Sequence, residues 1–146
     1  MLQGMNDDEI PPLLPPDQMP PVVDQASLHH TWRALMGELG FGRAQMWVLF
    51  LQHGRQLHLG HLEDLPDEIA PADVRRVVRT FRAALREGRG VTCAFLYCRP
   101  GGSTRTQQDQ VWLATIAEAN PEWPVHLATD ESLSVYAPDD RMRASA

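Results

Sequence analysis

The chain has 146 residues, of which 43% are hydrophobic, and a formal net charge of -6. This is enough for one soluble domain with a single core. The acidic balance argues against general binding to a phosphate backbone, and the longest apolar runs are too short to span a bilayer. The two cysteines, Cys93 and Cys98, lie five positions apart on one expected strand. Their side chains should therefore point to opposite faces and stay unpaired, which predicts a cytoplasmic protein.

The two ends of the chain differ in composition from its middle. Residues 1–25 hold six of the twelve prolines and the acidic trio Asp7, Asp8 and Glu9. Such a segment predicts an extended or disordered arm, which either docks on a partner or wraps over the domain. We expect the globular domain over residues 26–137 and a polar tail over residues 138–146.

Hydrophobic periodicity predicts alternating helices and strands in the globular part. In chain order we expect a helix capped by Ser27, a hairpin, a helix, a buried strand, a helix and a second hairpin, over residues 28–39, 46–62, 72–87, 91–97, 107–119 and 125–136. This order predicts a single-domain α/β (α+β) sandwich, with a mixed central sheet flanked by helices. Whether the two hairpins share one sheet stays open.

A buried strand that runs into a Gly-rich loop and then a helix start is the most informative motif. Residues 91–112 read VTCAFLYCRPGGSTRTQQDQVW. With the element order, this motif resembles the JAB/MPN family in its RadC-like form, over roughly Ala44 to Tyr136. In that family a loop of the pattern His-x-His-Pro-x-Gly precedes Ser-x-x-Asp, the two His and the Asp hold zinc, and a Glu from an earlier strand activates its water. Here Pro100 and Gly102 match the loop, and Thr106-x-x-Asp109 matches the helix start.

The resemblance breaks at the metal ligands. Tyr97 and Arg99 occupy the two His positions, and arginine keeps its proton and its charge. The resemblance therefore implies a JAB/MPN-like fold that has lost its zinc and its protease activity, with no cofactor. Glu63 is a candidate remnant of the catalytic Glu. We expect Asp109 to pair with Arg99 or Arg105 and so to tie down the loop.

These observations favour a non-catalytic protein–protein interaction module over an enzyme, with a protein partner or a second copy of the chain. The expected partner surface is a row of arginines on one helix, although a solvated helix face would look the same: Arg75, Arg79, Arg82 and Arg86.

Two alternatives remain open. One is a small-anion site, or a metal-free thiol enzyme, in the loop from Cys98 to Thr106, with His126 as a distant candidate base. The residues of this loop site would be Arg99, Gly101, Gly102, Ser103, Thr104, Arg105 and Thr106. The other is a nucleic-acid accessory protein that uses the Arg75–Arg86 helix face, which the net charge argues against. The pair His58 and His61 cannot chelate a metal from a regular strand, because residues three apart face opposite sides.

Overall fold

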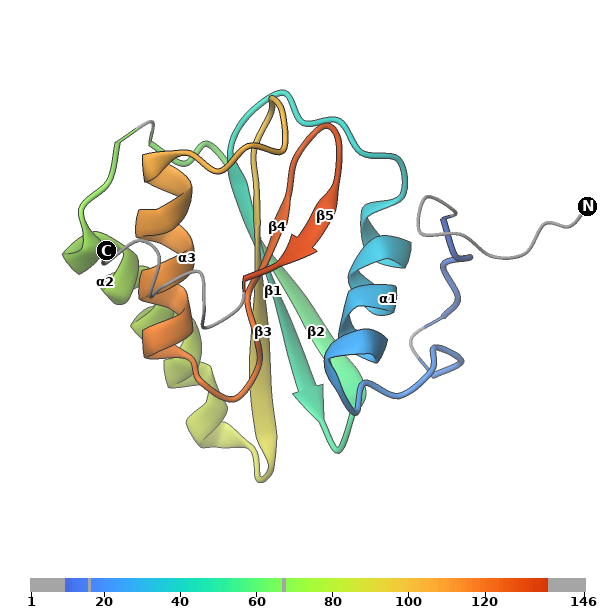
Figure 1. Ribbon diagram of the computed structural model, residues 1–146. Coiled ribbons are helices and arrows are strands. Elements are labelled where there is room, and N and C mark those ends of the chain that lie inside the picture. Colours follow the sequence, from blue (N-terminus) through green and yellow to red (C-terminus); the bar gives the residue numbers. More distant parts are fainter. Residues whose placement is uncertain (1–9, 16, 67, 137–146) are drawn as a thin grey trace, which may run out of the picture.

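The structure is a computed structural model of the chain, and it describes residues 10–15, 17–66 and 68–136. It is a single domain of three layers, in which one sheet lies between α1 on one face and α2 with α3 on the other (Figure 1). The expected α/β sandwich is confirmed. The elements are α1 (Gln25–Met36), β1 (Gln45–Gln52), β2 (Arg55–Leu62), α2 (Pro71–Ala83), the 3-10 turn η1 (Ala84–Glu87), β3 (Val91–Cys98), α3 (Gln107–Ala119), β4 (His126–Ala128) and β5 (Leu133–Val135).

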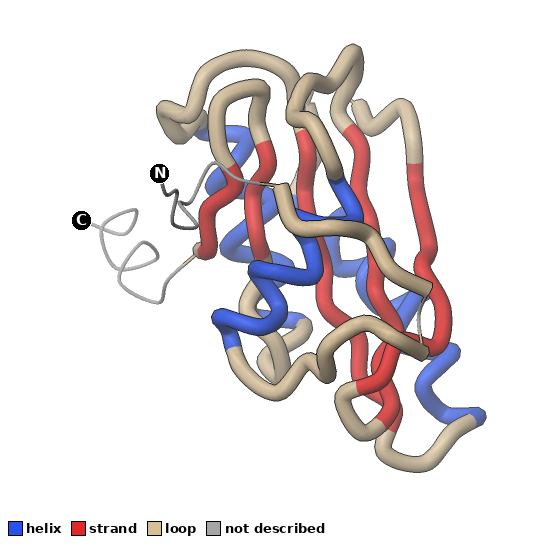
Figure 2. Tube along the Cα trace, turned by 90° about the vertical axis from the view of Figure 1, so that its right-hand side faces the viewer, coloured by secondary structure: helices blue, strands red, loops and turns tan. Residues whose placement is uncertain are grey.

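Both hairpins belong to the same sheet. Its five strands lie side by side in the order β2-β1-β3-β4-β5 (Figure 2). β1 is antiparallel to both β2 and β3, β3 is parallel to β4, and β4 is antiparallel to β5. The β1–β2 turn consists of His53 and Gly54, whose φ angles of 53° and 79° are both left-handed. Two such residues are what a two-residue hairpin requires, so β2 begins directly after them, at Arg55.

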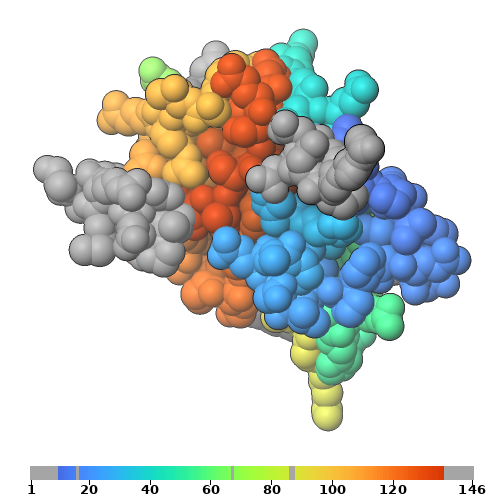
Figure 3. All heavy atoms as spheres, turned by 45° about the vertical axis from the view of Figure 1, so that its right-hand side comes forward, coloured from blue at the N-terminus to red at the C-terminus, as the bar shows by residue number. Residues whose placement is uncertain are grey.

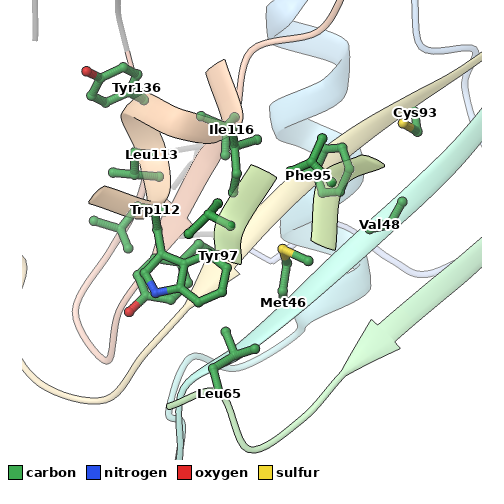
Figure 4. Packing of buried hydrophobic residues seen from close by; sticks show 14 of the residues in the cluster. Met46, Val48, Leu65, Cys93, Phe95, Tyr97, Trp112, Leu113, Ile116 and Tyr136 are labelled. Carbon is green, nitrogen blue, oxygen red and sulfur yellow. The ribbon is translucent and has the colours of Figure 1, made fainter. Parts of the chain in front are cut away.

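The sheet divides the core into two layers by side-chain alternation. On the α2 and α3 side, strand residues such as Met46 and Phe95 pack against Trp112 and Ile116 of α3 (Figure 4). On the α1 side, Leu49 and other strand residues pack against Trp32 of α1. Cys93 lies in the first layer and Cys98 in the second, and both are free. The expectation that they face opposite sides is confirmed.

α1 begins and ends three residues before the predicted helix. Its N-cap is Asp24, whose carboxylate accepts from the Ser27 amide at 2.8 Å, while the Ser27 hydroxyl accepts from the Asp24 amide at 3.0 Å. Ser27 is therefore the third helical residue of a capping box and not the cap itself, so the predicted range 28–39 is wrong. The helix ends at Met36, because the next residue, the C-cap Gly37, has a φ of 63°, outside the helical region.

The described part of the Pro-rich arm packs on the domain. Met19 and Val22 are buried, and the Val22 amide donates to the Gly54 carbonyl at 2.8 Å. The arm lies beside α1, as the dark blue atoms show (Figure 3). Residues 17–24 of the arm thus wrap over the domain, which is one of the two alternatives that the sequence left open. Residues 1–9 and the tail from 137 to 146 lie outside the described residues.

The second helix is shorter than its periodicity predicts. The α-helix ends at Ala83, and Ala84–Glu87 continues as a 3-10 turn before the chain enters β3. Tightening of the last turn is a common way to satisfy helix-terminal carbonyls, and residue periodicity does not distinguish the two forms. Within the described residues, no helix is both long enough and apolar enough to cross a membrane.

Candidate functional site

The Arg99 guanidinium is the centre of the loop that joins β3 to α3. Nε and Nη2 donate to the two carboxylate oxygens of Asp109, each at 2.7 Å. Nη1 donates to the carbonyls of Pro100 and Gly102, at 3.0 and 2.9 Å, and Nη2 donates to that of Thr104 at 3.0 Å. All five N–H groups of the guanidinium are thus used, so this single side chain sets the path of the loop.

Asp109 is the buried partner of this pair. Its side chain is 0% exposed, against 11% for Arg99. It also caps α3, because Oδ2 accepts from the Thr106 amide at 2.9 Å while the Thr106 hydroxyl accepts from the Asp109 amide at 3.0 Å. We expected Asp109 to pair with Arg99 or with Arg105, and the structure contains the pair with Arg99. A buried carboxylate requires such a partner, because an uncompensated charge in the interior is costly.

The β4–β5 turn holds the other side of the loop. The Gly101 amide donates to Asp130 at 2.8 Å, and the Ser103 amide donates to Glu131 at 2.8 Å. The bond from the Gly101 amide, with a further one from the Phe41 amide, lowers the pKa of the Asp130 carboxyl. Two of the loop amides that an incoming anion could use, those of Gly101 and Ser103, are therefore already bound to the protein's own carboxylates. The anion site stays a prediction, and Arg99, Gly101 and Ser103 could serve it only by giving up these bonds.

The remaining residues of the predicted anion loop bind within the protein or face the solvent. Arg105 lies over the ring of Tyr136, with its guanidinium carbon 5.5 Å from the ring centroid, and donates to the Val135 carbonyl at 3.4 Å. Thr106 is the cap of α3, and Thr104 supplies a carbonyl to Arg99. Gly102 is exposed, and a Cβ there would come within 3.2 Å of the Glu131 carboxylate. Glycine at that position allows the close approach of the turn.

Tyr97 and Arg99, which we predicted to stand in place of two zinc ligands, do not fit zinc. Tyr97 and Arg99 line the same hollow of about 520 Å³, beside Ala44 and Leu65. The Tyr97 ring stacks on Trp112 with centroids 5.2 Å apart (Figure 4), and burial raises the pKa of its hydroxyl to about 12. It is a neutral phenol at neutral pH, next to a fixed guanidinium charge. Among the described residues, no three His, Cys, Asp or Glu side chains gather as a metal site would require.

Cys98 lacks the environment of a catalytic thiol. It is fully buried under α1, and burial raises the pKa of its thiol far above the usual value. A nucleophilic cysteine needs the opposite shift and access to solvent. His126 is also buried, and it pairs in the sheet with Leu96 and not with Cys98. The thiol-enzyme alternative is therefore not supported by the geometry.

The histidines and Glu63 lie away from this loop. His58 approaches Phe50, whereas His61 stacks on Trp47, which belongs to the α1 layer. The two rings contact opposite faces of the sheet, as expected. Glu63 contacts His61 at 3.6 Å and lines a neighbouring hollow instead of the one that Tyr97 and Arg99 share. Its predicted role as a remnant of the catalytic Glu has no support in this arrangement.

The predicted arginine row separates into two kinds of residue. Arg82 binds inward, because its guanidinium donates to Glu122 and to Asn120, and Asn120 in turn donates to the Cys93 carbonyl at 2.9 Å. Arg75 and Arg79 are exposed and have no carboxylate partner within the described part of the chain. With Arg76 they surround a groove of about 860 Å³ on α2, whose apolar lining is Val78, Ala83, Leu85 and Ala119. The Arg86 side chain lies outside what the structure describes.

Sequence reasoning missed three residues that organise the site: Asn120, Asp130 and Glu131. The signal for the two acids was their place in the turn of the expected second hairpin. Their distance from the loop in sequence, 28 to 29 positions, hides the contact. In comparison with known proteins, no family model, curated protein or solved structure matches the chain.

Replacing Asp109 should destabilise the whole domain. We expect Asp109→Ala to lower the free energy of unfolding by about 3 kcal/mol, which is the lower end of the range for breaking a buried ion pair. The lower end applies because the Arg99 guanidinium keeps its three carbonyl partners in the variant. Urea denaturation measures this, and hydrogen exchange should show faster exchange of the loop amides. Asp73→Ala removes the exposed partner of Arg76 and should cost less than about 1 kcal/mol. Equal effects of the two variants would contradict a special role for Asp109.

His126 should make the protein sensitive to mild acid. Burial, and next the charge of His29, lower the pKa of His126 to about 3, whereas an unfolded histidine has a pKa of about 6.5. Between these values the unfolded state binds a proton that the folded state does not. The free energy of unfolding should therefore fall as the pH decreases from 6.5 towards 3, by up to about 1.4 kcal/mol per pH unit from this group.

Urea denaturation at pH 7, 5 and 4 checks this dependence against two variants. His126→Leu should lose stability less steeply with acid than the unaltered protein, because it removes the titrating group. His30→Leu, which alters an exposed histidine on α1, should keep the original slope. The same slope in all three proteins would contradict the assignment to His126.

Proposed function

We propose that the chain is a JAB/MPN-like domain, RadC-like in form, in which an ion pair stands where the family holds zinc, and that it acts as a non-catalytic protein–protein interaction module. The order of helices and strands and the place of the loop between β3 and α3 support the resemblance. We also place the protein in the cytoplasm, which the two free cysteines support.

The Arg99–Asp109 pair is the observation that carries this proposal. The family's second His corresponds to Arg99, and its Asp corresponds to Asp109. Here both oxygens of that Asp accept from the guanidinium, so the carboxylate that would bind the metal is already neutralised by a cation that cannot dissociate its proton. The same atoms that would form a metal site instead stabilise the loop, which favours retention of the fold without the chemistry.

The groove on α2 is the surface that best fits a protein partner. Arg75 and Arg79 are free to bind carboxylates, whereas the lining between them is aliphatic. A segment with acidic and apolar side chains would match both features. A nucleic acid fits less well, because no aromatic side chain lines the groove for base stacking and the net charge of the chain is -6.

Restoring the family's ligands should create a zinc site. If the resemblance holds, Tyr97→His with Arg99→His places two imidazoles beside Asp109 in one hollow, and the double variant should bind stoichiometric zinc. Mass spectrometry of protein purified without chelators or a His tag measures the metal, and the unaltered chain should contain far less. Adding Asp109→Asn to the double variant should abolish binding. A folded double variant without zinc would contradict the resemblance.

Neutralising the free arginines should remove the partner. We expect Arg75→Gln with Arg79→Gln to abolish the salt-sensitive capture of a protein from a nuclease-treated lysate of the source organism, measured by quantitative mass spectrometry. The matched control is Arg43→Gln with Arg89→Gln, which removes the same charge from exposed positions outside the groove. Capture that both double variants retain, or capture that nuclease eliminates, would contradict a protein partner at this groove.

A further inference from the structure

The Tyr97 side chain is almost wholly buried, yet its hydroxyl group has no hydrogen-bond partner among the described residues. The residue is 4% exposed, and it lines the hollow of about 520 Å³ that it shares with Arg99. Its ring stacks on Trp112, and Figure 4 shows the oxygen at the end of the ring that points away from Phe95. A polar group in such a position costs free energy unless water or a ligand supplies a partner. The hollow therefore contains a hydroxyl group that is free to bind a ligand.

Three side chains that line this hollow have spare hydrogen-bond donors. Burial raises the pKa of Tyr97 to about 12, so its hydroxyl keeps its proton at neutral pH. The side-chain oxygen of Gln108 accepts from the Ile69 amide at 3.0 Å, which leaves the NH₂ group of Gln108 to donate. Arg43 donates through one nitrogen to Asp64 at 2.7 Å, and no described residue accepts from its other N–H groups. A ligand that satisfies these donors must supply acceptor oxygens.

Apolar groups form much of the remaining lining. They come from Ala44, Leu65, Pro66 and Pro100. The Leu65 amide donates to the Ala44 carbonyl at 3.1 Å, so the backbone of this wall is in part satisfied within the protein. The volume lies within the range of about 300–1,000 Å³ that is usual for small-molecule sites, and such sites combine an apolar lining with a few polar groups. The hollow thus suits a small molecule with an apolar body and a polar end.

We propose that this hollow binds a small organic carboxylate, whose oxygens accept from the side chains of Tyr97, Gln108 and Arg43 and whose apolar body packs on the wall that contains Leu65. A carboxylate matches three donors because its two oxygens offer about four lone-pair sites, and its charge strengthens each bond. A carboxamide fits less well, because its own NH₂ group would face these donors.

This binding mode leaves the loop between β3 and α3 closed. The N–H groups of Arg99 are already used, and the Arg99–Asp109 pair stays intact when a ligand binds beside it. The site is therefore distinct from the predicted anion site at the loop amides. It also does not rest on the proposed function, because neither the resemblance to a zinc protease family nor the α2 groove enters the argument.

Titration of the full chain with sodium benzoate, followed by NMR of the ¹⁵N-labelled protein at constant ionic strength, tests the proposal. Benzoate should shift the backbone amide signals of Leu65 and Gln108 in a saturable manner. Benzamide has the same ring but lacks the negative charge and the second oxygen, so it should bind at least about tenfold more weakly. Absence of saturable benzoate binding, or equal binding of benzamide, would overturn the proposal.

Removal of the Tyr97 hydroxyl tests the residue that carries the argument. Tyr97→Phe should raise the dissociation constant for benzoate at least about tenfold, as expected for the loss of a hydrogen bond to a charged group. It should not lower the melting temperature, since no described residue depends on that hydroxyl. Tyr136→Phe is the matched control, because Tyr136 is the other tyrosine, is equally buried and does not line the hollow. Unchanged benzoate binding by Tyr97→Phe would show that the hydroxyl is only hydrated.

A second variant reverses a donor without removing a structural bond. Gln108→Glu keeps an oxygen for the Ile69 amide but replaces the NH₂ group with a negative oxygen, so it should abolish benzoate binding. Gln107→Glu adds the same charge at the neighbouring exposed position outside the hollow and should change the dissociation constant less than about twofold. Equal effects of the two variants would place benzoate elsewhere and overturn the proposal.

Discussion

The bidentate pair between Arg99 and Asp109 is the interaction on which the site depends. It joins the end of β3 to the first turn of α3, and through the other guanidinium N–H groups it also holds three carbonyls of the intervening loop. Asp109 is fully buried, so water cannot take the place of the Arg99 guanidinium as its partner. Breaking the pair would therefore leave an uncompensated charge in the interior. The loop is therefore part of the rigid scaffold, and it is poorly suited to open around a ligand.

The loop is a weak candidate for catalysis or anion binding because the protein itself already satisfies many of its hydrogen-bonding groups. The loop's amides at Gly101 and Ser103 are satisfied by Asp130 and Glu131, and the thiol of Cys98 faces the opposite core layer. Groups that bind substrates usually keep unsatisfied hydrogen-bonding capacity directed at a cavity. In this domain such capacity lies at the arginine-lined groove of α2 and at the hollow that Tyr97 and Gln108 line.

Much of the fold could be predicted from local patterns. The period of the apolar residues predicted three helices and both hairpins, and the range 107–119 of α3 agrees with the structure at both ends. Boundaries failed where two residues suit one role, as at α1, where Asp24 and Ser27 are both good caps and the structure uses Asp24 as the cap and Ser27 as the third helical residue. The 3-10 turn after Ala83 was invisible because both helical forms share the same apolar spacing.

What the sequence by itself determined is chemical: Arg99 cannot serve as a zinc ligand, Tyr97 is a poor substitute for a histidine ligand at neutral pH, and Cys93 and Cys98 must face opposite layers. Side-chain charge and strand alternation are local properties. Tertiary structure alone decided which arginine binds Asp109, that Arg82 binds inward while Arg75 and Arg79 stay exposed, and that the Asp130 and Glu131 turn fastens the loop. It also decided that β2 and not β1 is an edge. These outcomes depend on strand order and helix packing, which bring together residues far apart in the chain and leave no mark in local spacing.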